Sequence, residues 1–102
     1  MEFGLVVTDQ RHAVHAAGLL ACAAARGWST RCFLTDSGVR LLDDEGFMQQ
    51  ARARPQSVAV CRHSVDLLMA EADIAALKEV VVMGSQFQGA KLAQTCGILL
   101  VL

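Results

Sequence analysis

The stretch FGLVVTDQRHAVHAAGLLACAAARGWSTRCFL, residues 3–34, decides the fold of this chain. It holds two apolar runs rich in β-branched and aromatic residues, Phe3–Thr8 and Ser29–Leu34. Between them lies an alanine-rich segment, Gln10–Arg26, which we predict to be a helix that ends at Gly27, a residue suited to the left-handed position after a helix. A strand, a helix and a strand in this order form a βαβ unit and predict a parallel sheet.

The same alternation continues through the rest of the chain. A capping box, Ser85 with Gln88 three residues later, opens the last helix, and Gly97 ends it. The sequence predicts one α/β domain over residues 1–102, a three-layer sandwich with a mostly parallel five-stranded sheet and helices on both faces. The other predicted elements are strands at Ser57–Val60, Glu79–Met83 and Ile98–Leu102, a turn at Thr35–Gly38, a helical turn at Val39–Leu42, and helices at Phe47–Arg54, at Val65–Lys78 behind a capping Ser64 with a split near Ala72-Asp73, and at Gly84–Cys96.

The composition indicates an oligomer and argues against nucleic acid as the main ligand. In a chain of 102 residues, 54% hydrophobic residues is more apolar side chain than a monomer readily hides, because small domains bury a smaller fraction of their surface. We therefore expect a homo- or hetero-oligomer. Nine basic and ten acidic side chains give a net charge of −1. No run of Lys or Arg supplies the basic footprint that phosphate neutralisation needs.

The sequence shows neither the features of a signal peptide at its start nor an apolar stretch long enough for a membrane span. Residues Met1–Gly4 lack the positive segment that begins a signal peptide. The longest nearly uncharged apolar stretch, Ala13–Ala25, is shorter than the roughly 18 residues that indicate a membrane span. We expect a cytoplasmic protein with no membrane partner.

The four cysteines are predicted to be free thiols. They form no CxxC pair and no zinc-ribbon spacing, and disulfides are rare in a reducing compartment. Cys22 lies inside a predicted helix, Cys32 inside a strand and Cys96 at a helix end, which are positions typical of packing residues. Alternation leaves open which face of its strand Cys32 occupies.

Cys61 differs from the other three because it closes the strand Ser57–Val60 and precedes a predicted helix. At the carboxyl end of a parallel strand a ligand can meet the sheet, and helix N–H groups favour thiolate over thiol. Arg62 and His63 add two potential cations, with His63 as the expected catalytic companion and Arg62 as a substrate-binding group. The alternative is a small buried hydrophobic residue, since free cysteine is often buried.

Polar residues that follow other strands can share this edge with Cys61. His12 follows the first strand and Ser37 the second, and the ends of neighbouring parallel strands converge, so both are candidates for substrate binding. His12 and His15 share one helix face. No third or fourth metal ligand is visible, and a solvated helix face explains the pair. We therefore expect neither a metal site nor a cofactor.

Several familiar sites do not match the sequence. A receiver-like phosphoacceptor site needs a carboxylate where Cys61 stands, and capping and turn formation explain Asp9 and Asp36. The segment Gly84–Gly89 matches neither GxGxxG nor the phosphate loop. A rhodanese-like loop requires a basic residue about five positions after its cysteine, where this chain has Val65-Asp66-Leu67.

Short segments along most of the chain resemble the DsrE/DsrF-like family of small sulfur-relay proteins, which includes the TusD-type subunits. The most distinctive is Val58-Ala59-Val60-Cys61, in which a cysteine closes the third strand. The resemblance implies a three-layer α/β fold, homo- or hetero-oligomers, and sulfur carried as a persulfide on Cys61. Arg62-His63-Ser64 departs from the smaller residues that carriers often have there. The other matching segments are Gly4–Thr8, Ala25-Arg26-Gly27, Arg31–Leu34 with Asp36–Val39, and Gly84-Ser85 with Leu92-Ala93.

The leading expectation is a sulfur carrier or sulfurtransferase subunit. Cys61 would take sulfane sulfur from a donor protein and pass it to an acceptor protein, and activation requires a lowered thiol pKa because only the thiolate attacks. One alternative is a non-catalytic interaction module of the same fold, in which Cys61 is inert. Another is a small-anion or nucleotide binder that uses the ends of strands one and four.

Overall fold

A parallel five-stranded sheet forms the centre of the molecule, with the strand order β4-β3-β2-β1-β5. The computed structural model describes residues 1–102. The predicted parallel α/β fold is therefore confirmed. The strands are β1 (Glu2–Val7), β2 (Ser29–Leu34), β3 (Val58–Cys61), β4 (Val82–Gly84) and β5 (Ile98–Val101).

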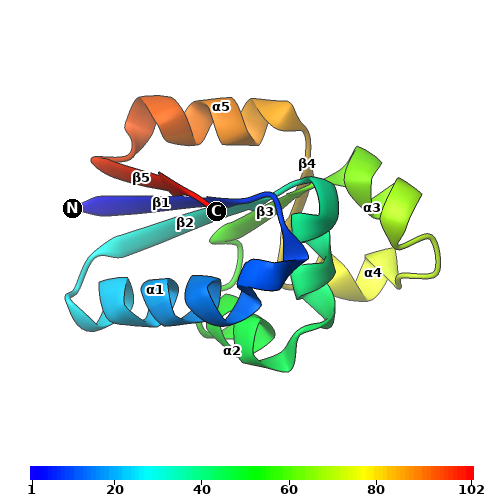
Figure 1. Cartoon of the computed structure of the whole chain (residues 1–102), viewed down its shortest axis with the longest axis horizontal. Coiled ribbons are helices and arrows are strands. Elements are labelled where there is room, and N and C mark those ends of the chain that lie inside the picture. Colours follow the sequence, from blue (N-terminus) through cyan, green and yellow to red (C-terminus); the bar gives the residue numbers. More distant parts are fainter.

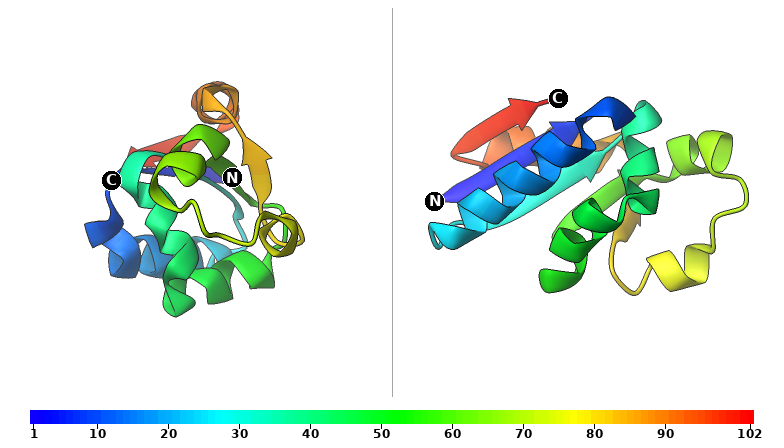
Figure 2. Two further views of the ribbon diagram at one scale, coloured as in Figure 1. Left: turned by 90° about the vertical axis from the view of Figure 1, so that its right-hand side faces the viewer. Right: turned by 60° about the horizontal axis from the view of Figure 1, so that its bottom comes forward.

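Helices cover both faces of the sheet and complete three layers (Figure 1). In that view α5 lies above the sheet, while α1 and α2 lie below it. The end-on view in Figure 2 likewise shows α5 standing apart from the other helices. No helix has both the length and the apolar character to cross a membrane. The helices are α1 (Ala13–Ala25), α2 (Glu45–Ala53), α3 (Arg62–Leu68), α4 (Ile74–Leu77) and α5 (Gln86–Thr95), with 3-10 helices η1 (Gln10–His12) and η2 (Asp36–Asp43).

The two faces of the sheet carry separate apolar clusters. The larger one joins the sheet to α1, α2 and η2 and includes Leu5, Leu34, Phe47 and Val60, which are all fully buried. On the α5 face a smaller cluster is formed by Phe33, Cys61 and Leu92. Alternation along each strand explains the division, because successive side chains of a strand point to opposite faces.

Local capping signals in the sequence are confirmed. Gly27 has a φ of 78°, the left-handed conformation expected after α1. Ser85 and Gln88 form both halves of the capping box at α5. Asp9 accepts a hydrogen bond from Arg11 N–H and caps η1, so the first helix begins as a 3-10 turn. The interruption near Ala72-Asp73 is also observed, with Asp73 capping α4.

Several predicted boundaries are wrong by two or three residues, among them the start of α2, which is Glu45 and not Phe47. α3 begins at Arg62 because Cys61 itself is the N-cap residue, so Ser64 lies within the first turn and is not the cap. The predicted turn at Thr35–Gly38 and helical turn at Val39–Leu42 form the single helix η2. β4 begins only at Val82, because the amides of the two preceding residues bond back to Leu77 O.

Candidate functional site

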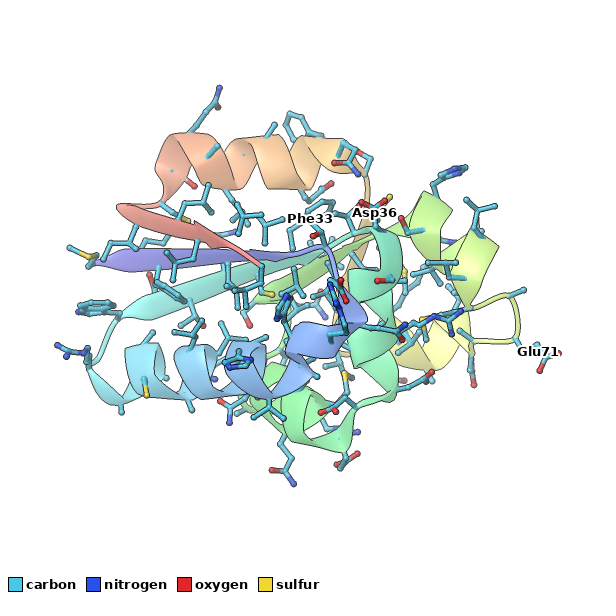
Figure 3. The ribbon with its side chains drawn as sticks, in the orientation of Figure 1. Phe33, Asp36 and Glu71 are labelled. Atoms are coloured by element: carbon cyan, nitrogen blue, oxygen red, sulfur yellow. The ribbon has the colours of Figure 1, made fainter.

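Cys61 stands at the carboxyl edge of the sheet, between the ends of β2 and β4. The strand register places it opposite Gly84 of β4, and the pairing of Leu34 with Val60 places Thr35 beside it on the β2 side. Its side chain packs with Phe33, which lies between α5 and the sheet in Figure 3. The edge position predicted for Cys61 is therefore observed.

Two buried hydroxyl groups flank the sulfur, and each already accepts a hydrogen bond. Thr35 Oγ1 accepts from Gln86 Nε2 at 2.9 Å, and Ser64 Oγ accepts from Asp36 N at 3.0 Å. Both residues are buried, at 7% and 6% exposure. A hydroxyl group has one hydrogen of its own. Because both oxygens already accept from N–H groups, each hydroxyl keeps its hydrogen for donation.

The surroundings of Cys61 favour its thiolate. Burial raises the pKa of the thiol, but hydrogen bonding by the Ser64 and Thr35 hydroxyls and by the N–H groups of Ser64 and His63 outweighs burial and lowers the pKa. The sulfur forms no regular N-cap hydrogen bond. The donors therefore act as oriented dipoles, three of them in the first turn of α3 and one, the Thr35 hydroxyl, at the end of β2, and they stabilise negative charge on the sulfur.

The cationic side chains beside Cys61 in the sequence turn away from this network. Arg62 Nε donates to Asp66 Oδ1 at 2.9 Å on the surface of α3. The His63 side chain is exposed, and only its backbone N–H contributes to the lowered pKa of Cys61. Helix geometry explains this, because α3 starts at Arg62 and successive side chains point in different directions around a helix.

His12 and Ser37 belong to neighbouring parts of the same edge. Ser37 Oγ accepts from Gln10 N–H at 3.1 Å and donates to Thr8 O at 3.5 Å, so it joins η1 to η2. The His12 ring lies 6.1 Å from the His15 ring, measured between centroids, in an edge-to-face arrangement. Neither residue is among the groups that shift the pKa of Cys61. No cluster of three or more metal-ligating side chains is present.

The sulfur of Cys61 is nearly covered. The residue is 5% exposed, and it lines neither of the two hollows of the structure. A large substrate therefore has no cavity at the thiol. What the arrangement can do chemically is hold one thiolate just below the surface, within reach of a small reacting group brought to the edge of the sheet.

Sequence reasoning missed the roles of Thr35, Gln86 and the Ser64 hydroxyl. A signal existed for Thr35, which directly follows the second strand as Cys61 ends the third, so the two were bound to be neighbours at one edge. The residue type and position of Ser64 indicate only a helix cap. No sequence pattern indicated Gln86, whose contact with Thr35 spans 51 residues.

Of the other three cysteines, Cys32 and Cys96 pack in or against the apolar clusters, whereas Cys22 does not, so the prediction that Cys22 is a packing residue is wrong. Cys32 is fully buried on the α1 and α2 face, and burial strongly raises the pKa of its thiol. Burial and the nearby Glu2 carboxylate raise the pKa of Cys96 as well. Cys22 is exposed on α1.

We expect Cys32 to resist alkylation in the native protein. Its thiol is 2% exposed and must be uncovered by opening of the core before it can react. If the folding stability is ordinary, the need for opening should make alkylation of Cys32 slower than alkylation of the exposed Cys22 by roughly three orders of magnitude or more. Iodoacetamide labelling followed by peptide mass mapping, with and without denaturant, checks this result. Equal native labelling of Cys32 and Cys22 would contradict the burial of Cys32.

The comparisons with known proteins support the fold. A solved structure of a conserved protein of unknown function from Bacteroides thetaiotaomicron is similar, with a TM-score of 0.67 over 99% of this chain and 94% of that chain. The two sequences are 14% identical, so the likeness concerns the fold alone. No protein-family model and no curated protein matches the chain.

Proposed function

We propose that the protein is a cytoplasmic sulfur carrier that holds sulfane sulfur as a persulfide on Cys61. The observation that carries the proposal is the set of neutral donors, two hydroxyl and two N–H groups, that lowers the pKa of this thiol despite its burial. A thiolate is the form that attacks a sulfur atom. The edge position of Cys61, shared with the DsrE/DsrF-like proteins that the sequence resembles, supports the same role.

The proposed transfer is an exchange of one sulfur atom. The Cys61 thiolate attacks the outer sulfur of a donor persulfide, R–S–SH, and forms a new S–S bond while the donor's own S–S bond breaks. The donor leaves as R–S⁻, and the outer sulfur keeps its proton as Cys61–S–SH. An acceptor thiolate then removes that sulfur in the same way and restores the Cys61 thiolate. No external oxidant, metal or cofactor is required.

The near-complete cover of Cys61 supports delivery by proteins that dock at the sheet edge. Because Cys61 is 5% exposed and lines no cavity, the thiol suits a cargo of one atom presented by a partner. Homo- or hetero-oligomeric assembly belongs to the proposal. Exposed apolar side chains supply area for such contacts; the large ones in helices and strands are Val14, Leu67, Leu68, Phe87, Leu100 and Val101.

The same exposed apolar side chains favour a second candidate, a non-catalytic interaction module in which Cys61 is inert. The two functions predict opposite reactivities for the thiol. A lowered alkylation pKa of Cys61 supports the carrier, whereas an ordinary pKa together with a stable protein complex supports the module.

Replacing Cys61 with serine is expected to abolish sulfur uptake. The reduced protein, incubated with a persulfide donor, should gain one sulfur atom in its intact mass, and the Cys61→Ser variant should gain none. Cys22→Ser is the matched control, because it removes an exposed thiol outside the network and should leave uptake unchanged. If the protein gains no sulfur, or if the gain survives in Cys61→Ser, the carrier proposal fails.

A further inference from the structure

A hollow of about 160 Å³ lies between α5 and strands β2, β3 and β4. Its floor is one register row of the sheet, Phe33, Ala59 and Val82. Alanine is the smallest of the three side chains, so the row dips at its centre. The α5 side of the hollow is mixed, with the apolar side chains of Phe87 and Leu92 beside polar ones that include Gln88 and Lys91.

One end of this hollow is polar and carries positive charge. Arg31 lies two residues before Phe33 on β2 and shares its face of the sheet. Arg31, Ser57, which directly precedes β3, and Lys91 of α5 all line the hollow. No Asp or Glu lines it. Arg31 is paired with Glu2 at 2.8 Å, but Lys91 belongs to none of the chain's four ion pairs.

A second set of donors borders the same space. The Gln88 side chain lines the hollow, and its Oε1 accepts from Ser85 N–H at 2.8 Å. This bond uses the amide oxygen and leaves the NH₂ group of Gln88 as a donor. The hollow thus combines an apolar body with cationic and neutral donors, the composition typical of a small-ligand site.

We propose that this hollow, which we call the α5 pocket, binds a small organic carboxylate. The apolar part of the ligand lies over Ala59, between Phe33 and Val82, and its carboxylate meets the ammonium of Lys91. The size limits the ligand to a compact body, since a cavity of about 150 Å³ accommodates benzene. The whole chain has a net charge of −1. A protein with a net negative charge does not attract anions in general, so binding of a carboxylate must depend on the local positive charge of Lys91.

The α5 pocket is separate from the thiol and independent of sulfur transfer. Cys61 follows Ala59 by two residues on the same face of β3, but it does not line the pocket. Phe33 and Leu92 contact both the pocket and Cys61. Carboxylate binding is therefore expected to persist in Cys61→Ser, so that failure of either proposal leaves the other standing.

Benzoate is the probe that tests the α5 pocket. In an NMR titration of the ¹⁵N-labelled protein, benzoate should cause saturable shifts at the amides of Ser57, Ala59 and Lys91. The dissociation constant is expected on the order of 1 mM, as for a ligand of this size. Benzylamine, which has the same ring and the opposite charge, should leave these amides unshifted at the same concentration.

Two substitutions locate the carboxylate and the ring. Lys91→Gln should weaken benzoate binding about fivefold, the loss of one surface charge interaction, whereas Lys78→Gln, which removes the only other lysine, should have no effect. Ala59→Leu should abolish binding by filling the floor. If Ala59→Leu fails to fold, the comparison of the two lysine variants decides. Equal binding of benzylamine, shifts confined to another surface, no saturation by about 10 mM, or unchanged binding in Lys91→Gln overturns the proposal.

Discussion

Replacing Gly38 with alanine is expected to destabilise the protein by about 3 kcal/mol, because the new methyl group would meet the backbone of β1. A Cβ atom built at Gly38 lies 2.1 Å from Val7 O and 2.7 Å from Val7 C. Val7 O is fixed as well, since it accepts a hydrogen bond from Thr35 N–H at 3.0 Å. For a domain of this size the melting temperature should fall by about 15 °C, which calorimetry or thermal circular dichroism measures.

Gly18→Ala is the matched control for this prediction. Gly18 is exposed on α1, and a Cβ atom there would have no neighbour within 4 Å. Alanine in a helix interior is favoured over glycine by about 0.8–1 kcal/mol, so this variant should melt at a slightly higher temperature. Equal loss of stability in the two variants would contradict the close approach of η2 to β1.

The Gly38→Ala substitution should also lower the reactivity of the Cys61 thiol. η2 begins at Asp36, whose N–H donates to Ser64 Oγ at 3.0 Å. A displacement of η2 weakens that bond and disturbs the direction of the Ser64 hydroxyl. Slower alkylation of Cys61 is therefore expected in the folded fraction of Gly38→Ala, with no such change in Gly18→Ala.

Removing both hydroxyl donors is expected to raise the pKa of Cys61 and to slow its reactions. The double variant Thr35→Val, Ser64→Ala loses two of the groups that lower the pKa of Cys61, while the burial that raises this pKa remains. One hydrogen bond to a charged group contributes about 1.5–3 kcal/mol, so alkylation below the pKa should slow by at least about tenfold. The rate in the wild-type protein should rise with pH and level off below the pH of an ordinary thiol. In the double variant the same curve should move to higher pH.

Thr30→Val provides the control for the loss of a buried threonine hydroxyl. Thr30 lies on β2, is 7% exposed, and is not among the groups that shift the pKa of Cys61. Its replacement should leave the alkylation curve in place. An unchanged curve in the double variant, or a curve in the wild-type protein at the position of an ordinary thiol, would remove the physical basis for a reactive Cys61.

The same lowered pKa links Cys61 to folding stability. Because the folded pKa lies below the unfolded one, this thiol stabilises the fold above its unfolded pKa, and the contribution is lost as the pH falls through the folded pKa. For Cys32 the sign is opposite. Burial raises its folded pKa, so its contribution is present below the unfolded pKa and is lost as the pH rises toward the folded value.

Much of the fold could be predicted because its signals are local. The limits of β2 match the prediction, Ser29–Leu34, and Gly27 and Ser85 end and begin helices as their conformational preferences dictate. Local signals failed where tertiary contacts decide. Ser64 is an ordinary cap residue by type, yet the strand continues through Cys61 and the helix starts directly after it.

The candidate site was only partly predictable for the same reason. The edge position of Cys61 follows from strand order. The side chains of Arg62 and His63, however, do not act on the thiol, although both residues directly follow it in sequence. Arg62 pairs with Asp66 one turn along α3, a contact that a helix start at Val65 concealed. The groups that do act on the thiol are the Thr35 hydroxyl, at the end of β2, and the Ser64 hydroxyl with the backbone N–H groups of the first turn of α3. Their approach depends on the register between β2 and β3 and on the helix start directly after Cys61.

The position of β1 between β2 and β5 has a consequence for biosynthesis. β1 is synthesised well before one of its partners, β5 (Ile98–Val101). Two hydrogen bonds fix this pair, Leu102 N–H to Val6 O at 2.7 Å and Thr8 Oγ1 to Leu102 O at 2.9 Å, and they join residues 96 and 94 positions apart. Until translation delivers that segment, β1 has one bare edge that a nascent neighbour could capture. Such distant closure is slow, so β1 keeps an unpaired edge for longer than a strand whose partners are near it in sequence.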